Sequence, residues 1–290
     1  MRNHSRAGWP ARLAITALLL GLASASSASA ATLDEIHERG SIRIAVANEE
    51  PYGYIDEHGE PRGAGPEVAL HLMDELGIES IEWIETTFGD LIPGLREGRF
   101  DMAAAEMAIL PERCAQILYS EPNTTYGEGL LVRATNPGTI TSYADFAQRD
   151  DVKVAVMAGA DQREILMALD VPDDRIVTLE RNEDAIGAIT GGQADAYAAT
   201  GLTVSALERI DNDVEVVLDF VDPVIDGEAV RSWGGFAFGP EAGELRDAVN
   251  EALTAYKRTN AWEQILTDHG FTQDDVLNSF RFSTEQLCSG

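Results

Sequence analysis

Ser41-Ile42-Arg43-Ile44-Ala45-Val46-Ala47 is a short run of mostly apolar residues, and it predicts the first buried strand of the chain. Residues 66–76 follow with apolar side chains recurring on one face, which predicts an amphipathic helix. Residues 81–86 form a second strand pattern. Strand patterns that alternate with helical ones are typical of an α/β fold, so this stretch predicts the fold class.

The alternation continues along the chain in two series separated by the Asn136-Pro137-Gly138 turn. The first series adds strands at 100–105 and 129–134, a helix at 91–97 and a short helix that begins at Pro111, a residue suited to a first turn. The second series has strands at 152–157, 175–179, 194–199 and 214–220 and helices at 143–148, 161–169, 183–190 and 202–209. An extended segment at 233–238 and a helical region at 241–277 complete the pattern.

Two series of this kind predict two α/β lobes with one inserted into the other. We assign residues 31–132 and 238–290 to lobe 1, which is discontinuous, and residues 133–237 to lobe 2. Two extended crossings, near 127–135 and 231–239, then connect the lobes. This design places a cleft between the lobes and a hinge behind it.

The N-terminus carries the pattern of a secretory signal peptide over residues 1–30. Three arginines precede the apolar run Leu13 to Leu22, and Ala28-Ser29-Ala30 supplies a small-residue cleavage site. The alternatives are a membrane anchor or a core helix, but the run is shorter than the about 20 apolar residues that span a bilayer. We therefore expect cleavage near Ala30 and a mature protein in the periplasm.

The chain is strongly acidic, with 21 basic and 50 acidic residues and a formal net charge of −29. Loss of the three signal-peptide arginines makes the charge more negative still. Such a surface repels nucleic acid and anionic lipid, so neither is an expected partner. Only two lysines are present, Lys153 and Lys257. This composition suits salty surroundings, although an ordinary acidic exported protein remains the alternative.

Cys114 and Cys288 are the two cysteines of the chain, and an even count in an oxidising compartment predicts one disulfide. Such a bridge would fasten the C-terminal tail to the first lobe; the alternative is two buried free thiols. No Cys/His cluster has zinc spacing, and no Walker-type phosphate loop occurs. We therefore expect no metal and no cofactor.

Several segments, in this order and spacing, resemble the extracytoplasmic solute-binding proteins of ABC importers, specifically the polar amino acid-binding family 3. These segments are Gly40-Ser41-Ile42-Arg43-Ile44-Ala45, Pro51-Tyr52-Gly53-Tyr54, Phe88-Gly89-Asp90-Leu91-Ile92-Pro93-Gly94-Leu95, Gly98-Arg99-Phe100-Asp101, and Pro111-Glu112-Arg113 leading to Tyr119-Ser120-Glu121-Pro122. The resemblance implies a type II periplasmic-binding-protein fold with two hinge crossings. It also implies a monomer that is not an enzyme and that delivers a solute to a membrane permease.

Within that family the chain is similar to the ectoine- and hydroxyectoine-binding proteins. The segments that carry this similarity are Ala47-Asn48-Glu49-Glu50-Pro51-Tyr52, Leu91-Ile92-Pro93-Gly94-Leu95, Pro111-Glu112-Arg113-Cys114 and Glu285-Gln286-Leu287-Cys288. The implied ligand is ectoine, a compact zwitterion with a carboxylate and a delocalised cation on an amidine ring.

A pocket for such a zwitterion needs a fork of N–H donors and a carboxylate. Arg113 can grip the ligand carboxylate with two parallel hydrogen bonds; its alternative role is a surface salt bridge with Glu112 or Glu106. Glu49 lies where the first strand ends and can face the cationic ring, or it is one solvated acid among many.

The resemblance assigns the aromatic walls of the pocket to Tyr52 and Phe88, which can stack on the ligand cation. From the residues alone, both would be assigned to the core, since aromatic residues at strand ends are more often core residues. A third aromatic position of the ectoine pattern falls near Ala108, where this chain has no ring. We expect Met107 or Trp233 to fill the missing wall, unless the ligand is a different one.

The second lobe departs from the family pattern at two places. Residues 156–161 stand where relatives place a glycine-rich loop ending in Thr; backbone N–H groups there could still bind an anion, but Asp161 favours a cation. The segment Ala198-Ala199-Thr200-Gly201 lacks the Asp that amino-acid binders use there for an α-ammonium; Thr200 can donate a hydrogen bond to a ligand or simply cap a helix.

Three alternatives to ectoine binding remain. The chain could bind a polar amino acid on the same fold. It could be an exported dehydratase or lyase, which requires an acid/base pair in the cleft. It could be a receptor sensor domain, although no membrane-spanning pattern follows the lobes. The histidines show no pattern of partners that would favour catalysis, so no catalytic residue is predicted.

Overall fold

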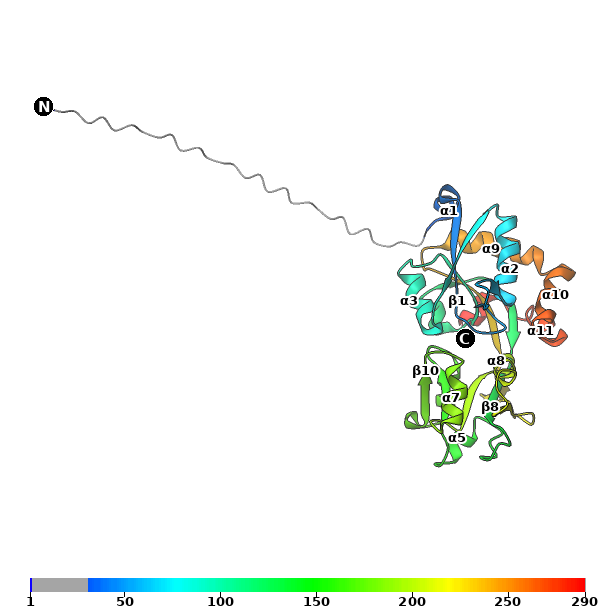
Figure 1. Cartoon of the computed structure of the whole chain (residues 1–290). Coiled ribbons are helices and arrows are strands. Elements are labelled where there is room, and N and C mark those ends of the chain that lie inside the picture. The colour runs from blue at the N-terminus through cyan, green and yellow to red at the C-terminus, as the bar shows by residue number, and fades with distance from the viewer. Residues whose placement is uncertain (2–30, 290) are drawn as a thin grey trace.

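The computed structural model describes Met1 and residues 31–289, so the predicted signal peptide lies outside the described residues apart from Met1. Two lobes stand one above the other, with residues 31–127 in the upper lobe and most of residues 128–231 in the lower one (Figure 1). Each lobe is built on its own sheet with helices on its faces, which confirms the α/β prediction.

The upper lobe contains a six-stranded sheet with the order β4-β1-β5-β15-β6, and β7 pairs with β15. β1 runs parallel to β4 and β5, whereas β15 runs antiparallel to its partners. These strands are β1 (Ser41–Val46), β4 (Ser80–Glu85), β5 (Met102–Ala108), β6 (Leu118–Tyr119), β7 (Thr124–Tyr126) and β15 (Ser232–Phe238). The helices of this lobe are α1 (Leu33–Arg39), α2 (Ala64–Glu75), η1 (Phe88–Asp90), α3 (Leu91–Arg96), α4 (Pro111–Cys114), α9 (Gly243–Tyr256), α10 (Asn260–Asp268), α11 (Gln273–Asn278) and α12 (Thr284–Ser289).

The lower lobe contains a five-stranded sheet with the order β10-β9-β11-β8-β12. Its strands are β8 (Glu128–Arg133), β9 (Val154–Met157), β10 (Ile176–Leu179), β11 (Ala196–Thr200) and β12 (Val214–Val216). Its helices are α5 (Asp145–Gln148), α6 (Gln162–Ala168), η2 (Asp173–Arg175), α7 (Asp184–Thr190) and α8 (Gly201–Glu208). Two small hairpins, β2–β3 (Tyr54–Ile55 and Pro61–Arg62) and β13–β14 (Val224–Ile225 and Glu228–Ala229), lie outside the two sheets.

The hydrophobic pattern of β1 explains how the upper sheet is anchored. Ile42 and Ile44 are fully buried in the core cluster that also contains α2 residues such as Leu72. Arg43, which alternates with them, donates to the buried carboxylate of Asp101 at 2.7 Å. Arg39 binds the same carboxylate at 2.6 Å, so Asp101 fastens the start of β1 to the segment that leads into β5. These contacts hold the opposite, carboxyl end of β1 in position toward the other lobe.

The strand pairing shifts both predicted lobe boundaries. We expected lobe 1 to extend to 132 and lobe 2 to extend to 237. Glu128–Arg133 instead pairs with β11 and β12 of the lower sheet, and Ser232–Phe238 pairs with β5, β6 and β7 of the upper one. Both segments are apolar strands that could pair in either lobe, so the sequence pattern located the crossings near 127–135 and 231–239 but could not assign each strand to a lobe. The chain therefore crosses near Gly127 and again just before Ser232.

The predicted disulfide is confirmed, because Cys114 at the end of α4 is bonded to Cys288 in α12. It joins residues 174 positions apart and holds the C-terminal helix against the upper lobe. In the entropic model a loop of this length stabilises the fold by about 5 kcal/mol. No free cysteine occurs in the described residues. Within the same residues, no helix has the length and apolarity that a membrane crossing requires.

Candidate functional site between the lobes

A small cavity lies between the two lobes. The upper lobe contributes residues at the carboxyl ends of β1, β5 and β7, and the lower lobe contributes the loops after β9 and β11. This is the position expected for a ligand in an α/β protein, because strand ends and the loops that follow them face the crevice. The lining residues are Glu49, Tyr52, Phe88, Ala105, Glu106, Tyr126, Met157, Ala160, Asp161, Gln162 and Thr200.

Three aromatic rings form the upper wall of this cavity. Tyr52 and Phe88 were predicted to lie there, and the structure brings them together. Tyr126, at the end of β7, is the third ring; it stands edge-on to Tyr52 with 5.0 Å between ring centroids. Its hydroxyl donates to the Glu106 carbonyl oxygen at 2.8 Å, which fixes the ring against β5. Tyr126 was not predicted as a site residue, because an aromatic residue in a short strand is usually part of the core.

The walls of the cavity are rich in buried carboxyl groups. Glu49 accepts a hydrogen bond from the Thr203 hydroxyl at 2.7 Å, and burial raises the pKa of Glu49 to about 7. Glu106 accepts from Asn123 at 2.7 Å and from Thr124 at 2.8 Å, and burial raises its pKa to about 7 as well. With Asp161 also on the wall, the cavity favours a ligand that carries positive charge.

Glu128 lies behind the lower wall and completes this acidic set. One of its oxygens accepts from the Tyr143 hydroxyl at 3.0 Å and from the Gln162 side chain at 2.8 Å. The other oxygen, Oε1, is buried and has no hydrogen-bond partner. Burial first, and then the neighbouring Asp161, raises the pKa of Glu128 to about 8. Gln162 therefore links the cavity wall to a carboxyl group that holds its proton near neutral pH.

Arg113 lies at the seam between the lobes. Its side chain is buried, so the alternative of a surface salt bridge was wrong. The guanidinium donates to the Ala108 carbonyl at 3.0 Å and to the Gly159 carbonyl of the lower lobe at 2.9 Å, and it lies 5.7 Å from the centre of the Phe88 ring. These two bonds use two of its five N–H donors. Its predicted role, to grip a ligand carboxylate, stays a prediction.

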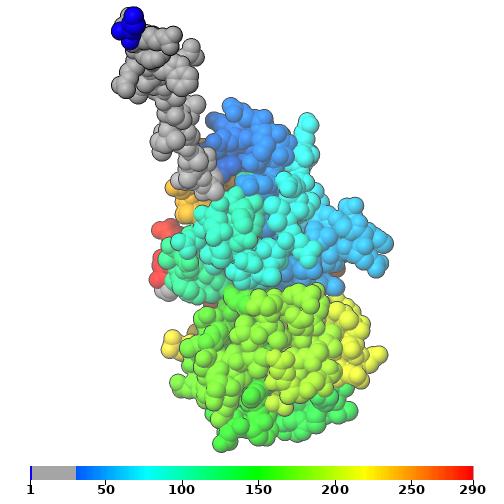
Figure 2. All heavy atoms as spheres, turned by 60° about the vertical axis from the view of Figure 1, so that its left-hand side comes forward, coloured from blue at the N-terminus to red at the C-terminus, as the bar shows by residue number. Residues whose placement is uncertain are grey.

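Direct hydrogen bonds join the lobes around the cavity, so the structure represents a closed arrangement. The Tyr52 hydroxyl donates to Thr200 Oγ1 at 2.8 Å, and Thr203 bridges to Glu49. On the outside of the seam, Arg209 pairs with Glu50 at 2.9 Å. The space-filling view shows the lower lobe packed directly beneath the upper one (Figure 2).

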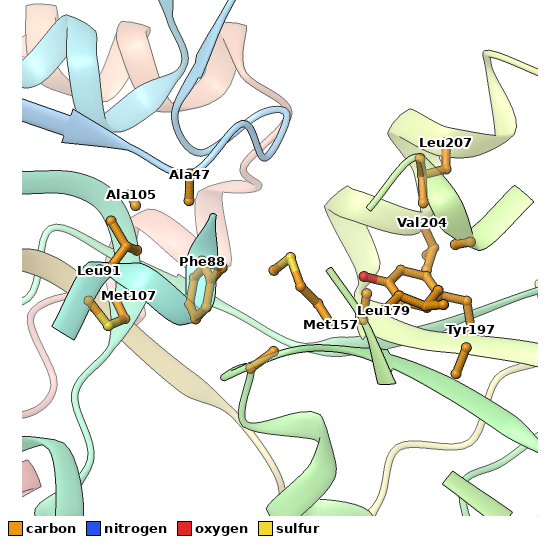
Figure 3. Packing of buried hydrophobic residues seen from close by; sticks show 14 of the residues in the cluster. Ala47, Phe88, Leu91, Ala105, Met107, Met157, Leu179, Tyr197, Val204 and Leu207 are labelled. Atoms are coloured by element: carbon orange, nitrogen blue, oxygen red, sulfur yellow. The ribbon is translucent and has the colours of Figure 1, made fainter. Parts of the chain in front are cut away.

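Apolar contacts reinforce this closure. Phe88 and Met157 come from different lobes and point toward each other across the seam (Figure 3). Gly159, with φ of +78°, passes so close to the upper lobe that an added Cβ would lie 3.0 Å from Gly89 Cα. The glycine therefore provides both the left-handed backbone and the close approach that place its carbonyl beside Arg113.

The two remaining lower-lobe predictions, Asp161 and Thr200, both lie on the cavity wall. Asp161 accepts from the Ser232 hydroxyl of β15 at 3.0 Å. Thr200 is the N-cap of α8 and accepts from Thr203 N at 3.1 Å. Thr200 therefore both caps α8 and lies on the cavity wall.

Trp233 and Met107 do not replace the missing aromatic wall. The Trp233 indole donates to the Asn278 carbonyl at 2.9 Å and packs against Phe282, on the hinge side of the molecule. Successive strand residues face opposite sides, and its neighbour Ser232 already faces the lower lobe. Met107 lies in the core beside Leu91 (Figure 3). Both predictions were wrong, and Tyr126 occupies the wall instead.

Comparison with known proteins agrees with this arrangement. Residues 42–272 match the family model described as bacterial extracellular solute-binding proteins, family 3. The chain belongs to this family. A probable amino-acid ABC transporter periplasmic-binding protein of Sinorhizobium fredii is 47% identical over 281 residues, which covers 96% of this chain and 93% of the relative. The fold is therefore the type II periplasmic-binding-protein fold that the sequence predicted.

Two solved structures are also similar to this chain. The crystal structure of EhuB in complex with hydroxyectoine matches with a TM-score of 0.79 and 29% identity, over 88% of this chain and 97% of that one. The ancestral amino acid-binding protein AncCDT-1, a precursor of cyclohexadienyl dehydratase, matches with a TM-score of 0.70 and 29% identity, over 81% of this chain and 97% of that one. The family therefore consists of solute-binding proteins, and one of the similar structures, AncCDT-1, is a precursor of the enzyme cyclohexadienyl dehydratase.

Proposed function

We propose that the protein is the periplasmic solute-binding component of an ABC importer and that its ligand is ectoine or hydroxyectoine. The supporting observation is the composition of the interlobe cavity. Three aromatic rings, from Tyr52, Phe88 and Tyr126, stand beside the carboxyl groups of Glu49 and Asp161, which suits a delocalised ring cation. Arg113 lies within the same seam and suits the carboxylate of the zwitterion.

The two lobes would contact the solute in different ways. The solute first stacks on the aromatic rings of the upper lobe and then gains hydrogen bonds from the lower lobe. Because the closed state makes both sets of contacts, it binds the solute more tightly than the open state, and binding shifts the population toward closure. The closed protein is then recognised by a membrane permease. Export through the signal peptide over residues 1–30 belongs to the same proposal, as does the monomeric state.

Thermal shift with a panel of solutes tests the ligand. Because only the native protein binds, a solute at 100 times its Kd stabilises the fold by about 2.7 kcal/mol and raises Tm. We expect the largest rise with ectoine or hydroxyectoine. A rise in Tm only with polar amino acids such as arginine or glutamine would rule out ectoine and hydroxyectoine as ligands, but it would agree with the transport role.

A polar amino acid is the second candidate, and the 47% identical relative favours it, because that protein is described as a component of an amino-acid transporter. Asp161 offers a carboxylate for an α-ammonium group even though Thr200 does not.

Enzymatic turnover is tested by incubating each candidate solute with the protein and analysing the mixture by mass spectrometry. Recovery of unchanged solute is the result we expect, and a new product would place the protein beside the dehydratases.

A further inference from the structure

A pocket on the upper lobe, here called the C-terminal pocket, has a volume of about 380 Å³. None of the described residues lines both this pocket and the interlobe cavity. Its walls come from the segment before β7, from the end of α9, and from the segment between α11 and α12. The Cys114–Cys288 disulfide holds α12 to α4, so the pocket lies where the C-terminal tail is fastened to the upper lobe.

The C-terminal pocket gathers positive charge in a strongly acidic chain. Lys257, Arg258 and Arg281 line it, and Glu121 is the only acid among the described residues that do so. Three bases and one acid leave a local charge of about +2, whereas the whole chain has a net charge of −29. Charges more than about 8 Å apart are largely screened at physiological ionic strength, so the local bases govern whether an anion enters the pocket.

Two of these bases have no partner for their charge. In the part of the chain that the structure describes, Arg258 and Arg281 are the only arginines whose side chains make no hydrogen bond or ion pair. The other arginines donate to carboxylate, carbonyl or amide oxygens. Arg258 and Arg281 follow the C-terminal ends of α9 and α11, where the helix dipole favours a basic residue. The dipole explains the residue type but provides no acceptor for the guanidinium N–H groups, whereas an oxyanion would provide one.

Lys257 supplies a third, buried cation. The residue is 8% exposed, and its Nζ donates to the Pro122 carbonyl at 2.6 Å and to the Ser279 carbonyl at 3.0 Å. The Phe280 ring centre lies 4.2 Å from the same Nζ, and Pro122, Ser279 and Phe280 all line the pocket. The two bonds use two of the three N–H donors of the ammonium group, so one donor remains for an acceptor in the pocket. Burial lowers the pKa of Lys257 to about 7, and a bound anion would favour its charged form.

We propose that the C-terminal pocket is a binding site for a small dianionic oxyanion, of which sulfate is the simplest example. The two guanidinium groups would each donate N–H bonds to its oxygens, and the Lys257 ammonium would add a positive charge at the wall. The bound anion would join α9 to the segment between α11 and α12, because Arg258 and Arg281 come from these two parts of the chain. This site is independent of the solute that the interlobe cavity binds.

Calorimetric titration with sodium sulfate, in a background of sodium chloride, tests the proposal. The titration is done at about pH 6.5, where Lys257, with its pKa of about 7, is mostly charged. We expect one saturable site with a Kd below about 1 mM. Arg258→Gln and Arg281→Gln should each weaken sulfate about fivefold or more, and the double variant about 20-fold or more. Sulfate also raises Tm by exclusion from protein surfaces, so the binding heat and not Tm is the measurement.

The double variant Arg62→Gln, Arg99→Gln is the matched control, because it removes two exposed arginines of the same lobe that do not line the pocket. It changes the net charge by the same amount and should leave the Kd for sulfate within about twofold of the wild-type value. An equal loss of sulfate affinity in both double variants would show only non-specific attraction and overturn the inference. Absence of saturable sulfate binding to the wild-type protein would overturn it as well.

Discussion

The two walls of the interlobe cavity differ in chemistry and in origin. The upper wall presents three aromatic rings on strand ends of one sheet, together with Glu49 and Glu106. The lower wall comes from the loops after β9 and β11 and carries Asp161, Gln162 and Thr200. The upper wall can therefore attract a cation before the lobes close, whereas the lower wall adds hydrogen bonds only after the lobes have closed. Affinity should depend most on residues that contact both lobes.

Arg113 is not on the cavity wall but contacts both lobes beside it, because it lies 5.7 Å from the centre of the Phe88 ring and donates to the Gly159 carbonyl. Arg113→Ala should lower ligand affinity by 100-fold or more, since it removes the proposed carboxylate grip and one bond between the lobes, together worth about 3 kcal/mol or more. Titration calorimetry measures the change. Arg96→Ala removes an exposed arginine of the same lobe and should have no effect. Unchanged affinity in Arg113→Ala would remove this residue from the site.

Tyr126 tests whether the upper wall has three rings. Tyr126→Ala should weaken binding of ectoine by about 10- to 30-fold, because it removes one cation–π face worth about 0.5 to 2 kcal/mol together with its packing on Tyr52. Trp233→Phe, on the hinge side, should leave affinity unchanged. The reverse ranking of the two variants in the same titration would restore Trp233 as the third wall.

The Tyr52–Thr200 hydrogen bond isolates the contribution of the lower wall to closure. Tyr52→Phe keeps the ring and removes the bond to Thr200 Oγ1, so affinity should fall about fivefold, or about 1 kcal/mol. Thr200→Val should have a similar effect, and the double variant should be little worse than either single one. Fully additive losses in this cycle would show that the two groups do not interact in the bound state.

Glu128 should influence stability more than affinity. Its pKa is about 8 in the folded protein and 4.5 in the reference state, so the folded state retains a proton that the unfolded chain loses. Its contribution to stability is therefore complete below about pH 4.5 and is lost as the pH rises through about 8. Glu128→Gln removes this contribution, and its Tm should fall less steeply than the wild-type Tm between pH 5 and pH 8.

Glu49 and Glu106 titrate in the same direction, so the Glu128→Gln variant should retain part of the pH slope. Glu112→Gln, which changes an exposed glutamate, is the control and should follow the wild-type curve. If Glu128→Gln and wild-type melting curves keep the same pH slope, Glu128 does not titrate as a buried group.

The fold was largely predictable because strand and helix periodicities depend on neighbouring residues. Most predicted strands and helices agree with the structure within two or three residues. The helix Leu33–Arg39 was missed although Thr32 and Glu35 form a capping box at its start. The crossings fall within the predicted segments 127–135 and 231–239, but the lobe boundaries were displaced, because the apolar runs 128–133 and 232–238 have the same pattern whichever sheet they join.

The upper wall of the site was also largely predictable, because Glu49, Tyr52 and Phe88 lie in segments that carry the family resemblance. Tyr126 was missed because its importance arises from tertiary packing. A tyrosine that ends a three-residue strand has no distinctive local pattern. Trp233 was wrongly predicted to line the site because successive side chains of a strand face opposite sides of the sheet, so an error of one residue reverses the predicted face.

The most direct test of the account is the distance between the lobes in solution. The described residues have no free cysteine, so spin labels at Glu57→Cys on the upper lobe and Met167→Cys on the lower one would report this distance by double electron–electron resonance. Saturating hydroxyectoine should narrow the distance distribution to the closed distance of this structure, and Arg113→Ala should prevent this change. A distribution that stays the same when calorimetry shows hydroxyectoine bound would contradict closure around the solute.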